Sequence, residues 1–147
     1  MKTDSQQIKF RLITIESKQF AVLNEPKEHE SIKIDTNIRF DSDFSKRIVV
    51  VTPLFKFIGN DPFLQIEVSC VFEIEAASWD KMFVKEDDNL TIPKGISQHL
   101  ASLAVSTVRG ILFEKTAHTK KIILPLINIT KIITSDTILQ KNKLEDK

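Results

Sequence analysis

Apolar and polar residues alternate over several stretches of the first half of the chain, a pattern typical of half-buried β-strands. Residues 8–16 (IKFRLITIE) alternate in this way, and the strand is predicted to continue after a kink through residues 20–23. Residues 24–30 are polar and contain Pro26, so they predict a loop. Residues 31–41 alternate more cleanly, with apolar side chains on one face and polar or charged ones on the other.

Two further stretches predict strands that are richer in apolar residues. Residues 47–58 carry apolar side chains on both faces, and residues 63–76 alternate regularly after a turn signal at residues 59–62. Pro53 lies within the first of these stretches and lacks a backbone N–H, which predicts a bulge or an edge position. The first half therefore predicts four strands in an antiparallel meander.

The spacing of apolar residues becomes helical in the second half, after a mixed connector with a helical turn near residues 79–84. From Lys94 the apolar positions recur at helical spacing, with Thr91 as a candidate N-cap. The predicted core face comprises Ile96, Leu100, Leu103, Ala104, Thr107, Val108, Ile111 and Leu112. The opposite face is small and nearly uncharged, and it comprises Ser97, Ala101, Ser102, Val105 and Ser106.

The helix is followed by an apolar segment, residues 122–127 (IILPLI), in which Pro125 disfavours helix. Asn128 or Thr130 is a candidate cap for a second helix reaching residue 139. The sequence therefore predicts one α+β domain spanning residues 1–147, with an ordered core at about 8–140 and a charged tail at 141–147. Its sheet has four antiparallel strands, followed by a long helix, an extended apolar segment and a C-terminal helix, with both helices on one side.

Composition excludes several classes of protein. The chain has 147 residues and a net charge of +1, which argues against a dedicated nucleic-acid binder. It has three glycines and no glycine-rich phosphate loop. One cysteine, no apolar leader and no long apolar run favour a cytoplasmic protein that is neither secreted nor inserted in a membrane.

Candidate chemistry is sparse. His29, His99 and His118 lie far apart without metal-ligand spacing, and Cys70 is predicted to face the core, so no metal, cofactor or enzymatic site is expected. Three carboxylates on the outer face of the fourth strand are interpreted either as solubilising charges or as a docking patch: Glu67, Glu73 and Glu75. The apolar residues exceed what one core face needs, which predicts either self-association or an exposed groove for apolar clients.

The order of elements resembles the SecB family of protein-export chaperones. The stretch ILPLINITKII (residues 123–133) resembles the apolar, proline-containing segment that enters that family's last helix. The stretches FRLITIESKQF and FLQIEVSCVFEI resemble its first and fourth strands. The resemblance covers residues 8–140 and implies a homotetramer, a dimer of dimers. It also implies an ATP-independent holdase that keeps unfolded clients export-competent and delivers them to the SecA motor.

The resemblance also implies roles for particular residues. The candidate client groove comprises Phe40, Phe55, Phe57, Phe63, Ile122, Ile123, Leu124, Leu126 and Ile127. The candidate oligomer interface comprises Ala101, Val105, Val49 and Val51. Glu67 matches an acidic SecA-docking position, but two others stand as Gln19 and Leu23, and the family's glycine-rich acidic tail is replaced by QKNKLEDK. A SecB-like chaperone of a toxin–antitoxin pair, or an interaction domain with one folded partner, therefore remains an alternative.

Overall fold

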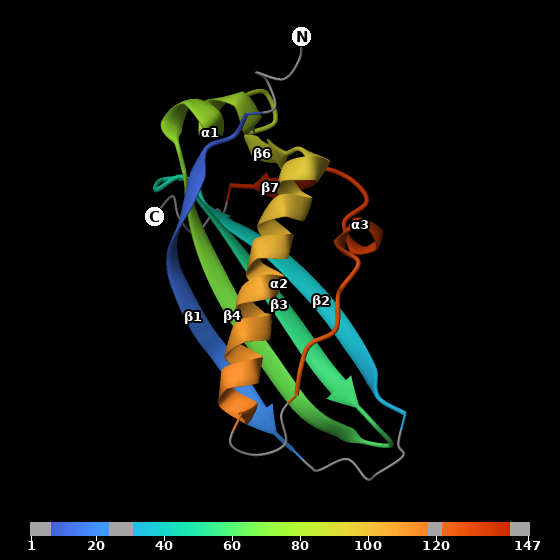
Figure 1. The fold of residues 1–147 in the computed structure, drawn as a ribbon. Helices are drawn as coiled ribbons and strands as arrows, with labels where there is room; N and C mark the ends of the chain where they lie inside the picture. Colours follow the sequence, from blue (N-terminus) through green and yellow to red (C-terminus); the bar gives the residue numbers. More distant parts are fainter. Residues whose placement is uncertain (1–6, 24–30, 118–121, 142–147) are drawn as a thin grey trace.

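The structure, a computed structural model, describes residues 7–23, 31–117 and 122–141. The predicted loop at 24–30, two of the three histidines and the tail beyond residue 141 lie outside this part of the chain. Four long strands form one twisted antiparallel sheet, and a long helix lies across one of its faces (Figure 1). The sheet strands are β1 (Phe10–Val22), β2 (Lys33–Asp43), β3 (Ile48–Ile58) and β4 (Pro62–Ile74).

The order of the strands differs from the predicted meander. The sheet runs β1-β4-β3-β2, so β2, β3 and β4 follow one another as neighbours but β1 pairs with β4. The chain between β1 and β2 must therefore cross from one edge of the sheet to the opposite edge. The alternation within each strand predicts its face but not its neighbours, because a neighbour is chosen by long-range pairing. Strand β1 has two register shifts, at Leu12/Thr14 and Ser17/Gln19, and the second lies where the kink was predicted.

Pro53 lies in the middle of the sheet, so the prediction of an edge or a bulge is wrong. It is buried in β3 opposite Ile38, and the register between β3 and β2 is continuous there. Toward β4, the registered pairs stop at Val51 and resume at Leu54. The missing pairs coincide with the missing N–H of proline. A buried hydrogen bond between Thr52 Oγ1 and Ser69 Oγ, 2.8 Å long, bridges β3 and β4 at this place.

The connector after β4 forms more structure than predicted. Helix α1 (Ala76–Met82) replaces the single predicted turn, and strands β5 (Phe83–Val84) and β6 (Asn89–Ile92) follow it. Strand β6 pairs with β5 on one side and with the C-terminal strand β7 (Thr137–Gln140) on the other. This small sheet and α1 lie together at one end of the main sheet (Figure 1). Phe44 packs edge-on against Trp79 and Phe83 there, with ring centroids 5.3 and 5.9 Å away.

The long helix α2 (Lys94–Thr116) confirms the predicted helix from Lys94, but its buried face is rotated from the prediction. Leu103 is exposed, whereas Ala101 and Val105, assigned to the outer face, are buried. The small residues Ala101 and Ala104 point at the sheet, where a short side chain allows a close approach of the helix. The buried residues of α2 are Ser97, Leu100, Ala101, Ala104, Val105, Val108, Leu112 and Thr116.

The predicted C-terminal helix is confirmed for one turn only, and its predicted extension to residue 139 is wrong. One helical turn, α3 (Ile129–Ile132), is followed by the extended β7, which places Leu139 opposite Leu90 of β6. Asn128 is at the N-cap position of α3, as predicted, but makes no side-chain capping hydrogen bond. The β-branched residues around Ile132 and Ile138 favour extended backbone, and β6 offers them a partner edge that the sequence pattern does not reveal.

Residues 136 and 137, which precede and begin β7, are hydrogen-bonded to the start of α2. The predicted cap Thr91 lies in β6, and the first residue of the helix, Lys94, donates its backbone N–H to Asp136 Oδ1 over 2.8 Å. The buried hydroxyl of Ser97 donates to Thr137 Oγ1 over 2.7 Å. Asp136, just before β7, therefore satisfies a free N–H at the start of a helix that begins about forty positions earlier, and Thr137 adds a side-chain contact to its first turn.

We expect Asp136→Ala to lower the free energy of unfolding by about 0.5–2 kcal/mol, the usual cost of losing a capping side chain. The measurement is the urea midpoint of the variant against the wild type. Asp87→Ala, which removes a carboxylate from an exposed turn, is the matched control and is expected to change the midpoint little. Equal midpoints for Asp136→Ala and the wild type would contradict the capping role.

Candidate functional site

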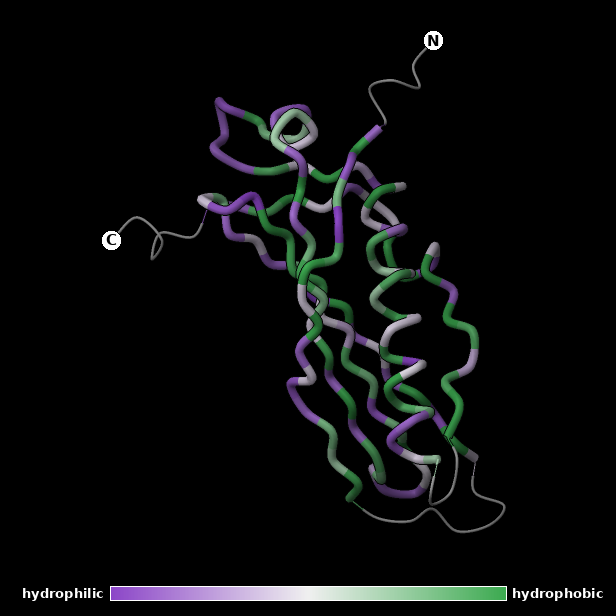
Figure 2. Tube along the Cα trace, turned by 60° about the vertical axis from the view of Figure 1, so that its left-hand side comes forward, coloured by the Kyte–Doolittle hydropathy of each residue, from purple (hydrophilic) through white to green (hydrophobic). Residues whose placement is uncertain are grey.

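A strap of residues 122–136 runs beside α2, in the same layer above the sheet, on the side of β2 (Figure 1). Most of the strap is hydrophobic (Figure 2). Leu124, Ile129 and Ile133 are buried in the core. Ile123, just before Leu124, and Leu126, just after Pro125, are 64% and 92% exposed. The predicted apolar segment is therefore divided, since part of it belongs to the core and part of it faces solvent.

Three side chains of α2 hold the strap by its backbone. Arg109 donates from Nε to the carbonyl of Leu124 over 3.0 Å and from Nη2 to the carbonyl of Pro125 over 3.1 Å. Gln98 donates from Nε2 to the carbonyl of Ile133 over 2.9 Å. Near the end of α2, Thr116 Oγ1 accepts the N–H of Ile122 over 3.0 Å. These contacts recognise main-chain groups, and none of them depends on the identity of a strap side chain.

The four phenylalanines predicted to line a groove are not together on the surface. Phe55 and Phe57 are buried on the inner face of β3, and Phe63 is buried at the start of β4. Phe40 is half-buried on the inner face of β2, as are Ile34 and Ile38. The inner face of β2 is thus the part of this predicted groove that keeps apolar accessible surface.

Strand β1 presents a second apolar strip that the sequence pattern did not single out. Leu12, Ile13 and Ile15 are exposed along the edge of the sheet, and Val22 is exposed near its end. The signal was present in the sequence, because residues 8–16 carry aliphatic side chains on both faces of the strand. The other edge strand, β2, carries two ion pairs along its length, Lys33 with Asp35 and Arg39 with Asp41. Strand β1 carries one, Glu16 with Lys18, beyond the aliphatic run.

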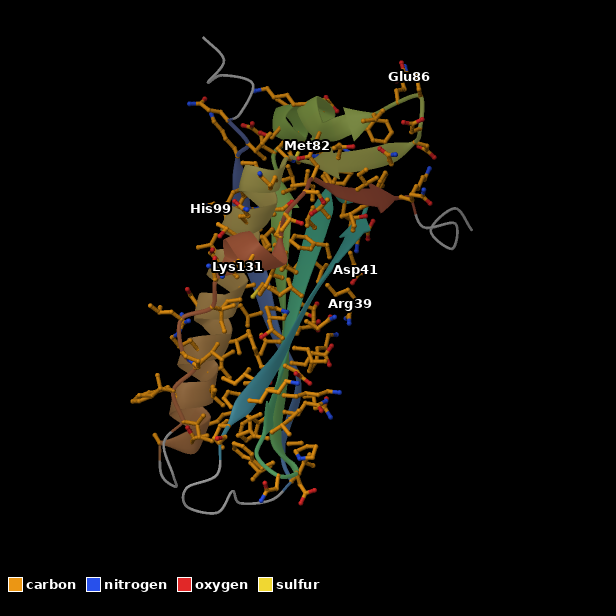
Figure 3. The ribbon with its side chains drawn as sticks, turned by 90° about the vertical axis from the view of Figure 1, so that its right-hand side faces the viewer. Arg39, Asp41, Met82, Glu86, His99 and Lys131 are labelled. Carbon is orange, nitrogen blue, oxygen red and sulfur yellow. The ribbon has the colours of Figure 1, made fainter. Side chains whose placement is uncertain are left out.

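The outer face of the sheet is not an open acidic patch. Arg39 and Asp41 project from β2 on the side away from α2 (Figure 3). Glu67, the predicted docking carboxylate, is one-fifth exposed and lies 3.5 Å from Arg39 Nη1. Glu73 pairs with Arg11 over 2.8 Å. Gln19, at a position where an acid was expected, accepts a hydrogen bond from the side chain of Gln65.

The residues predicted for an oligomer interface lie inside the chain's own core. Val49, Val51 and Ala101 have no accessible surface, and Val105 has almost none. Their side chains fill the space between α2 and the sheet, which is why they are small or β-branched. In this conformation they leave no surface for a second copy.

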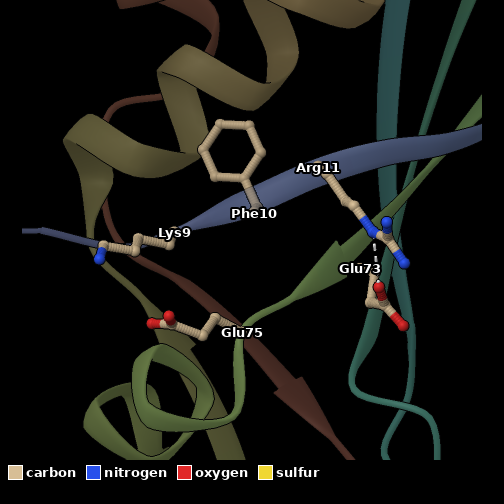
Figure 4. A pocket seen from close by; sticks show the side chains of 5 residues that line it. All are labelled: Lys9, Phe10, Arg11, Glu73 and Glu75. Atoms are coloured by element: carbon tan, nitrogen blue, oxygen red, sulfur yellow. Dashed lines mark hydrogen bonds and ion pairs between the residues drawn. The ribbon is translucent and has the colours of Figure 1, made fainter.

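A depression of about 240 Å³ lies at the start of β1 and is lined by Lys9, Phe10, Arg11, Glu73 and Glu75 (Figure 4). Its charges are balanced, and Arg11 and Glu73 pair with each other across it. The ring of Phe10 packs against Phe72 on one side and His99 on the other. The depression therefore has no surplus charge with which to attract an ionic ligand.

Groups suited to metal or covalent chemistry are few in the described residues. No three His, Cys, Asp or Glu side chains converge there on a possible metal site. Cys70 is fully buried, and burial raises the pKa of its thiol, while a hydrogen bond with Thr107 acts in the opposite direction. No helix in the described part of the chain is long and apolar enough to cross a membrane.

Comparison with known proteins gives low similarity. No protein-family model matches the chain, and no curated protein matches its sequence. Among solved structures, the Mycobacterium tuberculosis Rv1957 SecB-like chaperone, in complex with a ChAD peptide from the Rv1956 HigA1 antitoxin, is 13% identical with a TM-score of 0.49. The match covers 83% of this chain and 90% of that one. A Streptococcus agalactiae protein of unknown function is 13% identical with a TM-score of 0.38, covering 82% and 99%. Neither likeness assigns a function to this chain.

We expect Cys70 to react slowly with a thiol reagent at pH 8 in the native protein, because burial and a raised pKa reduce both access and the thiolate fraction. The reaction with a chromogenic disulfide is followed with and without urea. Unfolding is expected to release one rapidly reacting thiol per chain. Fast stoichiometric labelling of the native protein would contradict this placement of Cys70.

Proposed function

We propose that the protein is an ATP-independent holdase that binds unfolded polypeptides in the cytoplasm. The observation that carries the proposal is the exposure of large aliphatic side chains on the two strips that flank α2. One strip is β1, with Leu12, Ile13 and Ile15, and the other is the strap, with Ile123 and Leu126. Contiguous exposed apolar surface usually marks an interaction site. The sequence resemblance to SecB chaperones supports the same function.

An unfolded polypeptide is the partner whose chemistry fits these strips. It exposes apolar side chains in many orders, and aliphatic strips accept them without sequence preference. Full burial of one such side chain contributes about 1.5–3 kcal/mol. Several weak contacts on one assembly increase the affinity through effective concentration, while each contact remains reversible. This combination suits a protein that holds clients and releases them without ATP.

The edge of β1 also offers an unpaired backbone. The strand is thirteen residues long, and β4 uses only one of its sides. Open edges of this kind pair with another strand, from a second copy or from an extended client. We propose that β1, rather than the buried Val49, Val51, Ala101 and Val105, joins copies of the chain. A homotetramer built as a dimer of dimers remains the assembly that the sequence resemblance favours.

Delivery of clients to SecA is the less supported part of the proposal. A basic partner needs accessible carboxylates, whereas Glu67 lies beside Arg39 and the positions of Gln19 and Leu23 carry no charge. The proposal of client holding does not depend on a dedicated acidic dock. An antitoxin, which can be an unfolded client in its own right, is compatible with the same apolar strips.

The test of client holding is light scattering from a denatured reporter protein diluted into buffer with this protein at equimolar ratio. We expect the wild type to suppress aggregation, and Leu126→Asp to reduce the suppression several-fold because a charge interrupts the exposed strip. Thr134→Asp, which adds the same charge at another exposed position of the strap, is the control. A wild type that leaves aggregation unchanged and captures one folded partner would replace the holdase with an interaction domain.

The test of self-association is the mass in solution by light scattering after size exclusion. We expect an oligomer for the wild type and a smaller species for Ile13→Lys, since a charge within the exposed aliphatic run of the β1 edge opposes strand pairing. Lys33→Glu, on the opposite and already charged edge, is the matched control. A strictly monomeric wild type would remove both the β1 interface and the tetramer.

The role of Glu67 is tested by its replacement with lysine. We expect Glu67→Lys to leave the suppression of aggregation unchanged, because Glu67 lies on the outer face and not on either apolar strip. Binding to purified SecA is measured in parallel by interferometry. A loss of SecA binding in the variant would show that the outer face does serve as a dock.

A further inference from the structure

The strap is seated on the protein in the manner of a bound peptide. Over residues 122–127, no backbone-to-backbone hydrogen bond joins it to the rest of the described chain. Instead, the Arg109 guanidinium donates to two carbonyls of its main chain, and the Thr116 hydroxyl accepts one of its N–H groups. Leu124, near one end, is buried to 1% exposure. A sheet strand would be held by a ladder, whereas this segment is held by side chains that project from a helix.

The anchors of the strap define a simple recognition rule. Three aliphatic side chains enter the core at positions spaced by five and then four residues: Leu124, Ile129 and Ile133. The side chains between them face outward or lie half-buried, so they carry little of the recognition. Every polypeptide has carbonyls for Arg109 and Gln98, and every unfolded polypeptide has apolar residues at comparable spacing. The site beneath the strap therefore fits one chemical class of ligand, an extended apolar polypeptide.

We propose that the strap occupies, in the resting protein, the site at which an apolar segment of an unfolded client binds, and that the client displaces it. This inference rests on the proposed holdase function and deepens it. The strap then fills the groove in the absence of a client, whereas the sequence resemblance places residues 122–127 among the residues that line it. The floor is the inner face of β2 and β3, and Arg109 and Gln98 are the groups that bind the client's main chain.

Several features make the strap displaceable. Its only helix, α3, has four residues. Between residues 122 and 133, three side chains of α2 bond to its main chain. At its far end, Asp136 accepts the N–H of Lys94 and holds that end at the start of α2. Two bulky side chains, Ile123 and Leu126, already face solvent, where an incoming client can contact them before the strap leaves. Both ends are covalently part of the fold, because α2 precedes the strap and β7 follows it. The strap can therefore leave the groove and return to it without separating from the protein.

The probe is a fluorescein-labelled synthetic peptide with the strap's own sequence, IILPLINITKII (residues 122–133). We expect Leu124→Asp, which removes the buried anchor of the strap but leaves the groove intact, to bind the probe at least about tenfold more tightly than the wild type. The affinity rises by the inverse of the fraction of molecules in which the groove is open. Thr134→Asp is the matched control, with the same added charge at an exposed strap position. A second peptide, with aspartate at the positions of Leu124, Ile129 and Ile133, is expected not to bind.

Variants of Arg109 distinguish binding through the main chain of the peptide from binding through its apolar side chains. In the Leu124→Asp background, Arg109→Met is expected to lower the affinity for the probe several-fold, and Arg109→Lys to restore part of it, since a lysine donates to one carbonyl where the arginine fork donates to two. Equal affinity of the two double variants and Leu124→Asp would overturn the role of Arg109.

Hydrogen exchange on the wild type tests the displacement without any substitution, in case Leu124→Asp fails to fold. Addition of the unlabelled probe peptide in excess is expected to speed the exchange of the strap's amides, from Ile122 to Ile133, while amides of the floor strands β2 and β3 slow down. Slower or unchanged exchange in the strap would overturn the displacement.

The outcomes for the inference and for the holdase function are distinct. Suppression of aggregation by the wild type, without tighter probe binding by Leu124→Asp and without faster exchange in the strap, overturns the displacement and leaves the holdase standing. Probe binding by Leu124→Asp together with no suppression by any form supports the groove and overturns the holdase.

Discussion

The width of the main sheet is the constraint on which the rest of the structure depends. Four strands spaced about 4.8 Å apart make a face wider than one helix of about 10 Å diameter can cover. Helix α2 packs against β3 and β4, at the centre of the sheet. Apolar surface is left on both flanks, above β2 and along β1. The strap covers part of the first flank, whereas Leu12, Ile13 and Ile15 of β1 remain exposed on the other.

This arrangement explains why the strap is extended. A second full helix in that place would need a continuous apolar stripe and a helical backbone. Pro125 disfavours the αR conformation for Leu124, and the β-branched residues that follow lower the helix propensity. An extended chain covers more length per residue and can place an anchor wherever the sheet leaves a gap. Its cost is the loss of internal backbone hydrogen bonds, and Arg109, Gln98 and Thr116 offset that cost in part by pairing with main-chain groups.

The sequence was informative wherever a residue's environment depends on its near neighbours. Alternation identified the four long strands, and the spacing of Leu100, Ala104 and Val108 identified α2. The pairing of β1 with β4, and of β7 with β6, depends on contacts between distant parts of the chain, which no local pattern encodes. The same limit applies to the site. Residues 122–127 were recognised as unusual, but the alternation of buried Leu124 and exposed Leu126 is set by what lies beneath them. The phenylalanines of β3 satisfied the pattern of a groove and of a core equally well, and their position under α2 decided for the core.

The two edge strands of the sheet, β1 and β2, differ in how much apolar surface they expose. Strand β2 is protected by charges that pair along its own length, so it resists the addition of another strand. Strand β1 also carries one such pair, Glu16 with Lys18. The run before that pair, from Leu12 to Ile15, has no charged residue. An exposed aliphatic edge is an aggregation hazard in a protein that acts alone. Under the proposal that β1 joins copies of the chain and also binds clients, a second copy and a client strand would compete for the same backbone edge. The proposed self-association would then cover the edge when no client is present, and it would limit how many clients can bind along β1.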